Sequence, residues 1–328
     1  MTRGSLRGLA ALVQSFALFS PPAQRRRHES RAASPQIEGL ESKALLSLTA
    51  ITSTAGFPFK AIGQLTITYP NNKVFYGSGV LVDSYHVLTA GHNTYSSKDG
   101  GWAKTIKFTP LMTGGSAPYG SAFMTYERTY TSFINYNKKN PSSTATDIND
   151  IGLLTLDRKM GDKVGWMSYG YDDNNSRFAP GTIFNSAGFP AAGGYNGKTE
   201  YYSSGKIAGL SGDGRAIRYS QSEITTYGGQ SGGPVWLYKT SDGSRVIYGI
   251  HVGGSGKSNS LNFATRITKS IYTQIGSWRT ADKASTKSAS LHASAAASTS
   301  PGKGTAGHAS AAILANQVAY AAAGHRLS

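Results

Sequence analysis

The chain has 328 residues, no cysteine and a formal net charge of +16, and 39% of its residues are hydrophobic. The lack of cysteine excludes disulfide bridges and thiolate metal sites, and no apolar run reaches the length of about eighteen residues that a transmembrane helix needs. Lysine and arginine are scattered without a dense block, so we expect no membrane association and no specific nucleic-acid partner, but an attraction for acidic polypeptides.

The N-terminal residues 1–43 differ from the rest of the chain. Residues 1–23 place two arginines before the apolar stretch GLAALVQSFALF, which predicts a signal peptide cleaved near Ala23. A disordered basic tail is the alternative interpretation. Residues 24–43 are polar and basic, with a run of arginines, and predict a propeptide. Together the two segments predict a secreted protein that is processed at its N-terminus.

Residues 44–280 carry the short runs of an all-β protein. Runs such as QLTITY, VFYGSGVLV, IGLLTL and PVWLY recur between clusters of Gly, Asn, Asp and Ser. No long segment has a helical period before SIYTQIGSW, which predicts a short C-terminal helix. This spacing is typical of barrels or sandwiches. We expect one β domain at 44–160 and a second at 161–280, with the polar stretch 158–169 connecting them.

The first candidate functional residue is a histidine at the end of a predicted strand. β-Favouring residues from Val80 to Leu88 lead through Thr-Ala-Gly to His92. A histidine on a rigid strand is well placed for proton transfer. Further along, in NDIGLLTLD, Asp150 opens an apolar strand and could orient the histidine ring. Asp147 competes with Asp150 for this role.

The most informative stretch is GGQSGGP, which places Ser231 between glycines. A serine hydroxyl becomes a nucleophile when a base removes its proton and backbone N–H groups face the oxyanion that forms. The amides of Gly229 and Ser231 could form such an oxyanion hole if the turn is tight. The chain order His92, Asp150, Ser231 occurs in the chymotrypsin clan and differs from the orders of α/β-hydrolases and subtilisins. The sequence therefore predicts a His-Asp-Ser triad.

Three other motif matches carry less weight. The G-x-S-x-G pattern around Ser231 is followed by the strand-like VWLY, whereas a hydrolase elbow needs a helix. The phosphate-loop match AGGYNGKT begins with Ala192 in place of glycine, and no helical pattern follows it. YDDNN at 171–175 could hold calcium, although such a run is usually a solvated turn. We therefore expect no metal site and no cofactor.

Residues 281–328 are rich in Ala, Ser, Lys and Gly. Such a composition cannot bury enough apolar surface to fold independently. We expect a low-complexity tail there.

The stretches TSTAGFPFKAI, VLTAGH, NDIGLLTL, TTYGGQSGGPV, GIHVGG and NFATRITK resemble the glutamyl endopeptidases of the V8 and Bacillus type, which are chymotrypsin-fold serine proteases. The resemblance covers residues 52–278 and implies a secreted, monomeric endopeptidase of two antiparallel six-stranded β-barrels that acts on polypeptides. It makes His92 the general base, Asp150 its orienting partner and Ser231 the nucleophile. It also places the mature N-terminus of the relatives at about residues 42–45.

The same resemblance implies cleavage after glutamate. Strand 246–252 is similar to the strand that lines the P1 pocket of the family, with backbone offered to the substrate by Val252, Gly253 and Gly254. His251 and Thr226 can each donate a hydrogen bond to a substrate carboxylate. The segment 225–230 lacks the carboxylate that a trypsin-like pocket would need.

Three alternatives remain from the sequence. His251 could be a strand histidine satisfied by a neighbour, without a role in recognition. The protein could be a serine endopeptidase of another P1 specificity. It could also be a secreted, non-catalytic binding protein on a protease fold.

Overall fold

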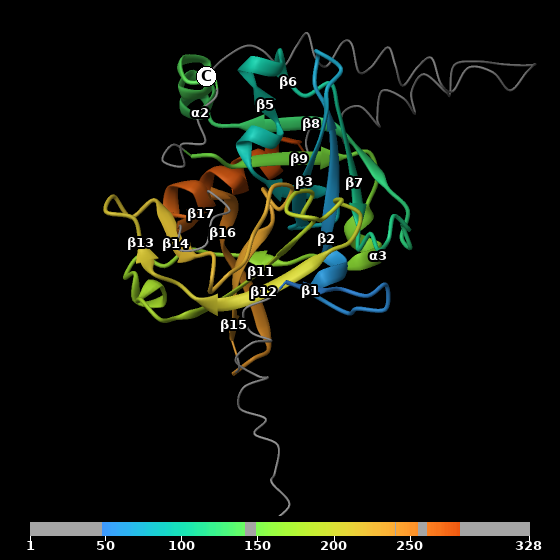
Figure 1. Ribbon diagram of the computed structural model, residues 1–328. Helices are drawn as coiled ribbons and strands as arrows, with labels where there is room; N and C mark the ends of the chain where they lie inside the picture. The colour runs from blue at the N-terminus through green and yellow to red at the C-terminus, as the bar shows by residue number, and fades with distance from the viewer. Residues whose placement is uncertain (1–47, 142–148, 240, 255–260, 283–328) are drawn as a thin grey trace, which may run out of the picture. The chain divides into compact units, whose positions relative to one another are not determined.

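The computed structural model describes a mostly β protein (Figure 1) over residues 48–141, 149–239, 241–254 and 261–282. The predicted signal peptide at 1–23, the predicted propeptide at 24–43 and nearly all of the predicted tail lie outside the described residues. Within the described part, no helix is long and apolar enough to cross a membrane.

Six antiparallel strands of the first half close into a barrel in the order β2-β3-β4-β9-β8-β7. The strands are β2 (Ile62–Thr68), β3 (Val74–Leu81), β4 (His86–Thr89), β7 (Thr105–Pro110), β8 (Ala122–Thr129) and β9 (Gly152–Leu156). β2 pairs with both β3 and β7, and this double pairing closes the barrel. The predicted first six-stranded barrel is therefore confirmed, within residues 62–156.

Among the described residues, the second half is not closed into the second barrel that the resemblance implied. Its strands make one nine-stranded sheet in the order β1-β12-β11-β15-β16-β17-β14-β13, and β10 pairs with β16 outside this path. The terminal strands β1 and β13 pair with β12 and β14, and among the described residues they do not pair with each other. The strands are β1 (Thr49–Ala50), β10 (Ser168–Tyr169), β11 (Ile183–Gly188), β12 (Tyr201–Lys206), β13 (Gly209–Leu210), β14 (Ala216–Ser220), β15 (Pro234–Lys239), β16 (Ser244–Gly254) and β17 (Leu261–Arg266).

Short elements connect the strands. β5 pairs with β6 in a two-stranded sheet beside the barrel. The predicted connection at 158–169 contains a helix and the strand β10, so it is more ordered than a plain linker. The remaining elements are η1 (Phe59–Ala61), η2 (Gly91–Asn93), β5 (Tyr95–Ser96), η3 (Ser97–Asp99), β6 (Gly101–Trp102), α2 (Thr131–Lys139), α3 (Met160–Val164) and η4 (Ser176–Phe178).

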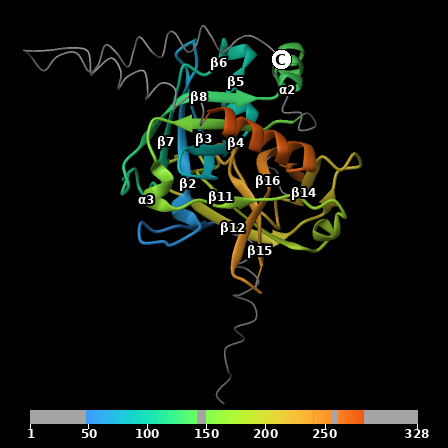
Figure 2. The same ribbon diagram turned by 180° about the vertical axis from the view of Figure 1, so that it is seen from behind.

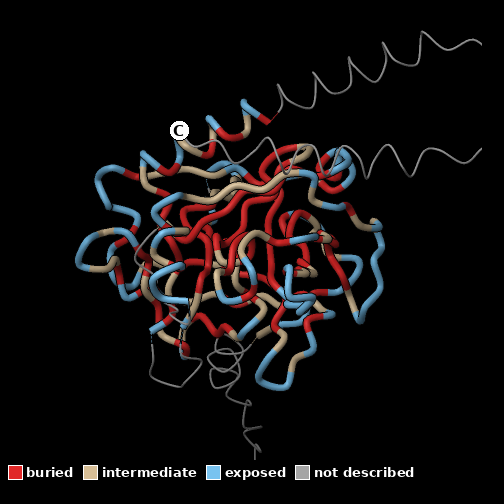
Figure 3. The backbone as a smooth tube through the Cα atoms, turned by 90° about the horizontal axis from the view of Figure 1, so that it is seen from above, coloured by how far each residue is buried: buried red, intermediate tan, exposed pale blue. Residues whose placement is uncertain are grey.

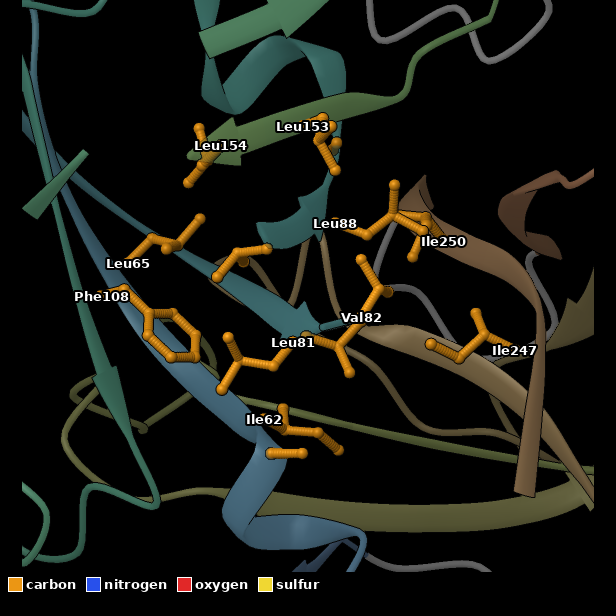
Figure 4. Packing of buried hydrophobic residues seen from close by; sticks show 14 of the residues in the cluster. Ile62, Leu65, Leu81, Val82, Leu88, Phe108, Leu153, Leu154, Ile247 and Ile250 are labelled. Carbon is orange, nitrogen blue, oxygen red and sulfur yellow. The ribbon is translucent and has the colours of Figure 1, made fainter. Parts of the chain in front are cut away.

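Buried side chains of both halves form one hydrophobic cluster. Figure 3 shows the buried backbone in the interior of the described body. Figure 4 shows barrel residues such as Leu81 and Leu88 in the same cluster as Ile247 and Ile250 of β16. A smaller cluster around Phe184 and Tyr219 fills the second half. Because the chain has no cysteine, this apolar packing takes the place that disulfides have in many extracellular proteins.

The predicted C-terminal helix is confirmed at 269–282 (red in Figure 2) and is attached to the barrel by two ion pairs. Arg279 Nε lies 2.7 Å from Asp83 Oδ2, and Arg128 Nη2 lies 2.6 Å from Asp282 Oδ1. Burial alone would raise the pKa of Asp83, but hydrogen bonds and charge from His86 and Arg279 hold that pKa below its usual range. The helix thereby fastens the end of the second half to the first.

Glu200 lies immediately before β12, with both carboxyl oxygens buried. Among the described residues neither oxygen has a hydrogen-bond partner. The Glu200 carbonyl accepts a hydrogen bond from Ile51 N at 2.8 Å, which fixes the backbone there. Burial raises the pKa of Glu200 well above its ordinary value, because removal from water disfavours the charged form.

We expect Glu200 to make the stability of the protein depend on pH. The folded state retains a proton that the unfolded state releases above about pH 4.3, so stability should fall as the pH rises from there through the raised pKa. Glu200→Gln cannot ionise. At pH 8, where the unfolded parent has released this proton, the variant should therefore be more stable than the parent. Chemical unfolding of both proteins at pH 8 and near pH 4 measures the difference between their free energies of unfolding. If this difference is not smaller near pH 4 than at pH 8, the prediction is contradicted.

Candidate active site

Asp150 holds His92 through two hydrogen bonds. β4 ends at Thr89, and the short helix η2, which carries His92, follows it at Gly91–Asn93. Asp150 Oδ1 accepts from His92 N at 2.9 Å, and Asp150 Oδ2 lies 2.8 Å from His92 Nδ1. The Tyr69 hydroxyl donates to His92 O at 2.6 Å. The ring is therefore fixed from the backbone and from Nδ1, and Nε2 is left for another partner.

The environment of His92 favours its charged form. Burial alone would lower the pKa of His92, and the ammonium of Lys98 lowers it further. The charge and the hydrogen bond of Asp150 outweigh both effects and raise that pKa above its ordinary value. The Asp150 side chain is almost fully buried, whereas the His92 side chain is 34% exposed. A base of this kind can take a proton and keep it during a reaction.

Ser231 is anchored to the first half by its carbonyl oxygen. This oxygen accepts from Ser78 N at 2.8 Å and from Asn93 Nδ2 at 2.9 Å. The Ser231 hydroxyl lies 3.5 Å from Val252 O, and within the described residues it does not bond to the His92 ring. The structure thus brings Ser231 to the cavity that holds His92, with its hydroxyl turned toward β16.

The turn before Ser231 needs glycine at position 229. Gly229 has φ +98°, and a Cβ there would lie 2.5 Å from Phe189 O and 2.7 Å from Ala191 N. Ser78 Oγ donates to Gly229 O at 2.9 Å and accepts from Phe189 N at 2.9 Å, which holds the turn. Within the described part of the chain, the N–H groups of Gly229 and Ser231 donate to no protein acceptor. Two neighbouring amides are thus available to an anion.

One cavity of about 520 Å³ collects most of the predicted site residues. It is lined by both halves of the molecule and by eight of the nine predicted residues: His92, Asp150, Thr226, Ser231, His251, Val252, Gly253 and Gly254. Gly229 does not reach its wall, although the adjacent Gly228 does. β16 has a bulge between His251 and Gly253, which interrupts the pairing with β17 where the strand meets the cavity.

His251 is buried, and the Tyr219 hydroxyl lies 2.6 Å from its Nδ1. Burial and the charge of His92 lower the pKa of His251 to about 3, although a hydrogen bond to the backbone of Phe263 opposes this shift. The imidazole is therefore neutral, and its Nδ1 already has a protein partner, as the alternative interpretation from the sequence proposed. His251 is nevertheless one of the residues that line the cavity.

Thr226 has its backbone fixed by a single glutamine side chain. Gln221 Nε2 donates to Thr226 O at 2.8 Å, and Gln221 Oε1 accepts from Thr226 N at 3.2 Å. The Thr226 hydroxyl makes no hydrogen bond with any described residue and belongs to a residue of the cavity wall. It can therefore donate to a bound group.

Several residues that shape the site were not identified from the sequence. Ser78 bridges two loops, Asn93 holds the Ser231 carbonyl, and Tyr219 orients His251. The glycines on both sides of Ser78 and the position of Asn93 next to His92 were the available signals. Tyr219 lies far from the motifs in sequence, and no local pattern points to it.

The YDDNN segment forms a turn stabilised by its own side chain. The Asp172 carboxylate accepts from Arg177 N at 3.0 Å and from Ser176 Oγ at 3.1 Å. Both hydrogen bonds end on Oδ2, and Arg177 Nη1 lies 3.3 Å from Oδ1, so the buried carboxylate closes a turn instead of facing solvent.

Comparisons with known proteins place these observations in context. A family model described as "Trypsin-like peptidase domain" matches residues 77–246. The chain is 35% identical over 236 residues to the extracellular metalloprotease of Bacillus subtilis strain 168, covering 70% of this chain and 67% of that protein. It is 28% identical over 234 residues to the glutamyl endopeptidase of Bacillus licheniformis, covering 70% of this chain and 66% of that protein. The chain thus spans about two thirds of each relative.

The fold is also found among solved structures. The structure of a Glu endopeptidase in complex with MPD aligns with a TM-score of 0.55 at 22% identity, covering 71% of this chain and 96% of that chain. This likeness supports the arrangement of strands around the cavity.

Proposed function

The chain is a serine protease of the trypsin-like peptidase family, and we propose that it is a secreted endopeptidase that cleaves peptide bonds after glutamate. The family membership implies polypeptide substrates. The observation that carries the proposal is the pair of hydrogen bonds that the Asp150 carboxylate accepts from His92, on the cavity that Ser231 also lines. This is the arrangement that activates a serine hydroxyl.

In the proposed mechanism, the Ser231 hydroxyl turns from Val252 O toward His92 Nε2 and attacks the substrate carbonyl. His92 takes the hydroxyl proton and later delivers it to the leaving amine. Asp150 keeps the proton on Nδ1 and stabilises the imidazolium. The amides of Gly229 and Ser231 donate to the oxyanion, and water then hydrolyses the acyl-enzyme.

Glutamate at P1 is supported by the donors in the cavity wall. The Thr226 hydroxyl has no hydrogen-bond partner among the described residues, and His251 is held neutral beside Tyr219. A carboxylate in this pocket would accept from the Thr226 hydroxyl and from the His251 ring nitrogen opposite Nδ1. The bulge at Val252 leaves backbone groups of β16 for the peptide itself.

The name of the Bacillus subtilis relative raises the question of a metal ion. Within the described residues, no group of three or more His, Cys, Asp or Glu side chains lies together to hold one. The donor set does not fit a catalytic zinc site, which needs three protein ligands, and we derive no step through a metal.

The function is tested by incubating the purified protein with an unstructured peptide mixture and sequencing the new termini. New termini that follow glutamate, and less often aspartate, are the expected result. Cleavage mainly after Lys, Arg or aromatic residues would refute the glutamate pocket and keep the peptidase assignment. No cleavage would leave the non-catalytic binding protein as the better interpretation.

His251→Ala should selectively impair cleavage after glutamate. A substrate carboxylate that enters the pocket without its donor loses a charge-assisted hydrogen bond. We expect kcat/KM for a P1-glutamate peptide to fall by roughly a hundredfold or more, and that for an apolar P1 residue to fall much less. Steady-state kinetics on the two peptides measure the ratio. Equal losses on both peptides would show that His251 has only a structural role.

Secretion and processing form the second part of the proposal. The curated relatives include an enzyme named as extracellular, and the predicted signal peptide and propeptide precede β1. We expect the active enzyme collected from the culture medium to begin within residues 42–45. Its N-terminal sequence decides this, and a start before Gln24 would contradict removal of a propeptide.

A further inference from the structure

The cavity extends well beyond the proposed P1 pocket, onto the first barrel. Its wall there is aromatic and is formed by Tyr69, Phe75, Tyr76, Tyr95, Phe133 and Tyr136. The cavity volume of about 520 Å³ lies within the range of roughly 300–1,000 Å³ that is usual for sites of drug-sized ligands. The cavity therefore has room for substrate residues that flank P1.

One cation lies on this wall. Lys98 is the single lysine or arginine among the cavity-lining residues that the structure describes. It is exposed, and within the described ranges it forms no ion pair. The neighbouring Asp99 carboxylate is buried and accepts from Ser96 Oγ at 2.6 Å and from Asn71 Nδ2 at 2.9 Å. The ammonium of Lys98 is therefore the exposed positive charge that a bound peptide would contact on this wall.

The backbone that carries Lys98 is fixed on both sides. Asn137 of α2 accepts from Ser97 N through Oδ1 at 2.7 Å, and its carbonyl accepts from Ser97 Oγ at 2.7 Å. Asn71 N donates to Asp99 O at 3.3 Å on the other side. The ammonium is also near enough to His92 to influence its pKa. Lys98 is thus a flexible side chain on a rigid base, close to the bond to be cleaved.

We propose that Lys98 forms a second acid-binding subsite, which selects substrates that carry another acidic side chain at a fixed position beside the P1 residue. The proposal rests on the proposed function, since it assigns a further specificity determinant to the same cavity. An ion pair at the rim lowers the energy of the bound peptide and of the transition state together, because the contact lies away from the reacting atoms. It should therefore act mainly through KM.

The test uses a reference peptide with glutamate at P1 and alanine at the flanking positions from P3 to P3′. Further peptides place one glutamate at each flanking position in turn. The parent, Lys98→Met and the control Lys163→Met are compared by kcat/KM on every peptide. Lys163 is an exposed lysine of α3 outside the cavity wall, so the control loses the same charge elsewhere.

We expect the parent to cleave one of these peptides about fivefold faster than the reference, which corresponds to a unit charge pair about 4 Å apart in water. Lys98→Met should reduce this ratio to about one, Lys163→Met should keep it, and high salt should weaken it in the parent. The proposal is overturned if the parent shows no preference for an added glutamate at any flanking position. It is also overturned if Lys98→Met keeps the parent's ratio of kcat/KM between the preferred peptide and the reference. A loss of P1 discrimination in Lys98→Met overturns it as well and would place Lys98 in the P1 pocket. A parent that fails to cleave the reference peptide instead refutes the proposed function.

Discussion

Ser231→Ala should abolish peptidase activity and leave the fold intact. The change removes one oxygen whose only hydrogen bond among the described residues is at 3.5 Å to Val252 O, so little stabilisation is lost. The contacts that anchor the turn use the Ser231 carbonyl, which alanine keeps. Without the nucleophile no acyl-enzyme forms, and kcat should fall on the order of 10⁶-fold.

The measurement is turnover of a P1-glutamate peptide, with thermal unfolding recorded on the same samples. Ser222→Ala is the matched control, because Ser222 is exposed and bonds only to Ser220 Oγ at 3.0 Å. It should retain parental turnover. A Ser231→Ala enzyme with activity within tenfold of the parent would remove Ser231 from the proposed triad.

Asp150→Asn should reduce kcat by about 10⁴-fold. The carboxylate accepts two hydrogen bonds from His92, one from the backbone N–H and one at Nδ1. An amide has only one acceptor atom, so one of these contacts would place two donors face to face. If the NH₂ group faces Nδ1, the ring proton moves to Nε2, and His92 can no longer accept the proton of Ser231.

Asp147→Asn is the comparison for this prediction. From the sequence, Asp147 is the alternative candidate for the residue that orients His92, and it lies outside the described residues. The comparison of the two aspartates is therefore made by experiment. We expect near-parental kcat for Asp147→Asn in the same assay. If the two variants behaved in reverse, the orienting role would belong to Asp147.

The sequence predicts the elements of this site better than their connections. His92 follows a β-rich run and Asp150 opens another, and the structure places both beside β4 and β9 as the patterns indicate. These predictions succeed because strand alternation and glycine turns are local properties of the chain. The bond from Ser78 to the Gly229 turn spans 151 residues, and no local pattern contains it.

In the second half of the chain, too, local sequence patterns predict the strands but not the way in which the strands are joined. The strands were predicted by their composition, but whether a sheet closes depends on which edges find a partner. β12 pairs with the two-residue β1 from the start of the described chain, and that pairing occupies the edge. A prediction, from family likeness alone, that the sheet of the second half closes into a barrel does not take the pairing of β1 with β12 into account.

The two ion pairs of the C-terminal helix limit the stage of folding at which the two halves of the protein can be joined. They join residues that are 196 and 154 positions apart, Asp83 with Arg279 and Arg128 with Asp282. Contacts of such long range form late, since the chain between them must first be ordered. During synthesis the first barrel emerges early, but the residues that fasten it to the second half emerge only after the last strand, β17. A nascent chain therefore cannot fasten its two halves in this way until residues 279–282 have been synthesised.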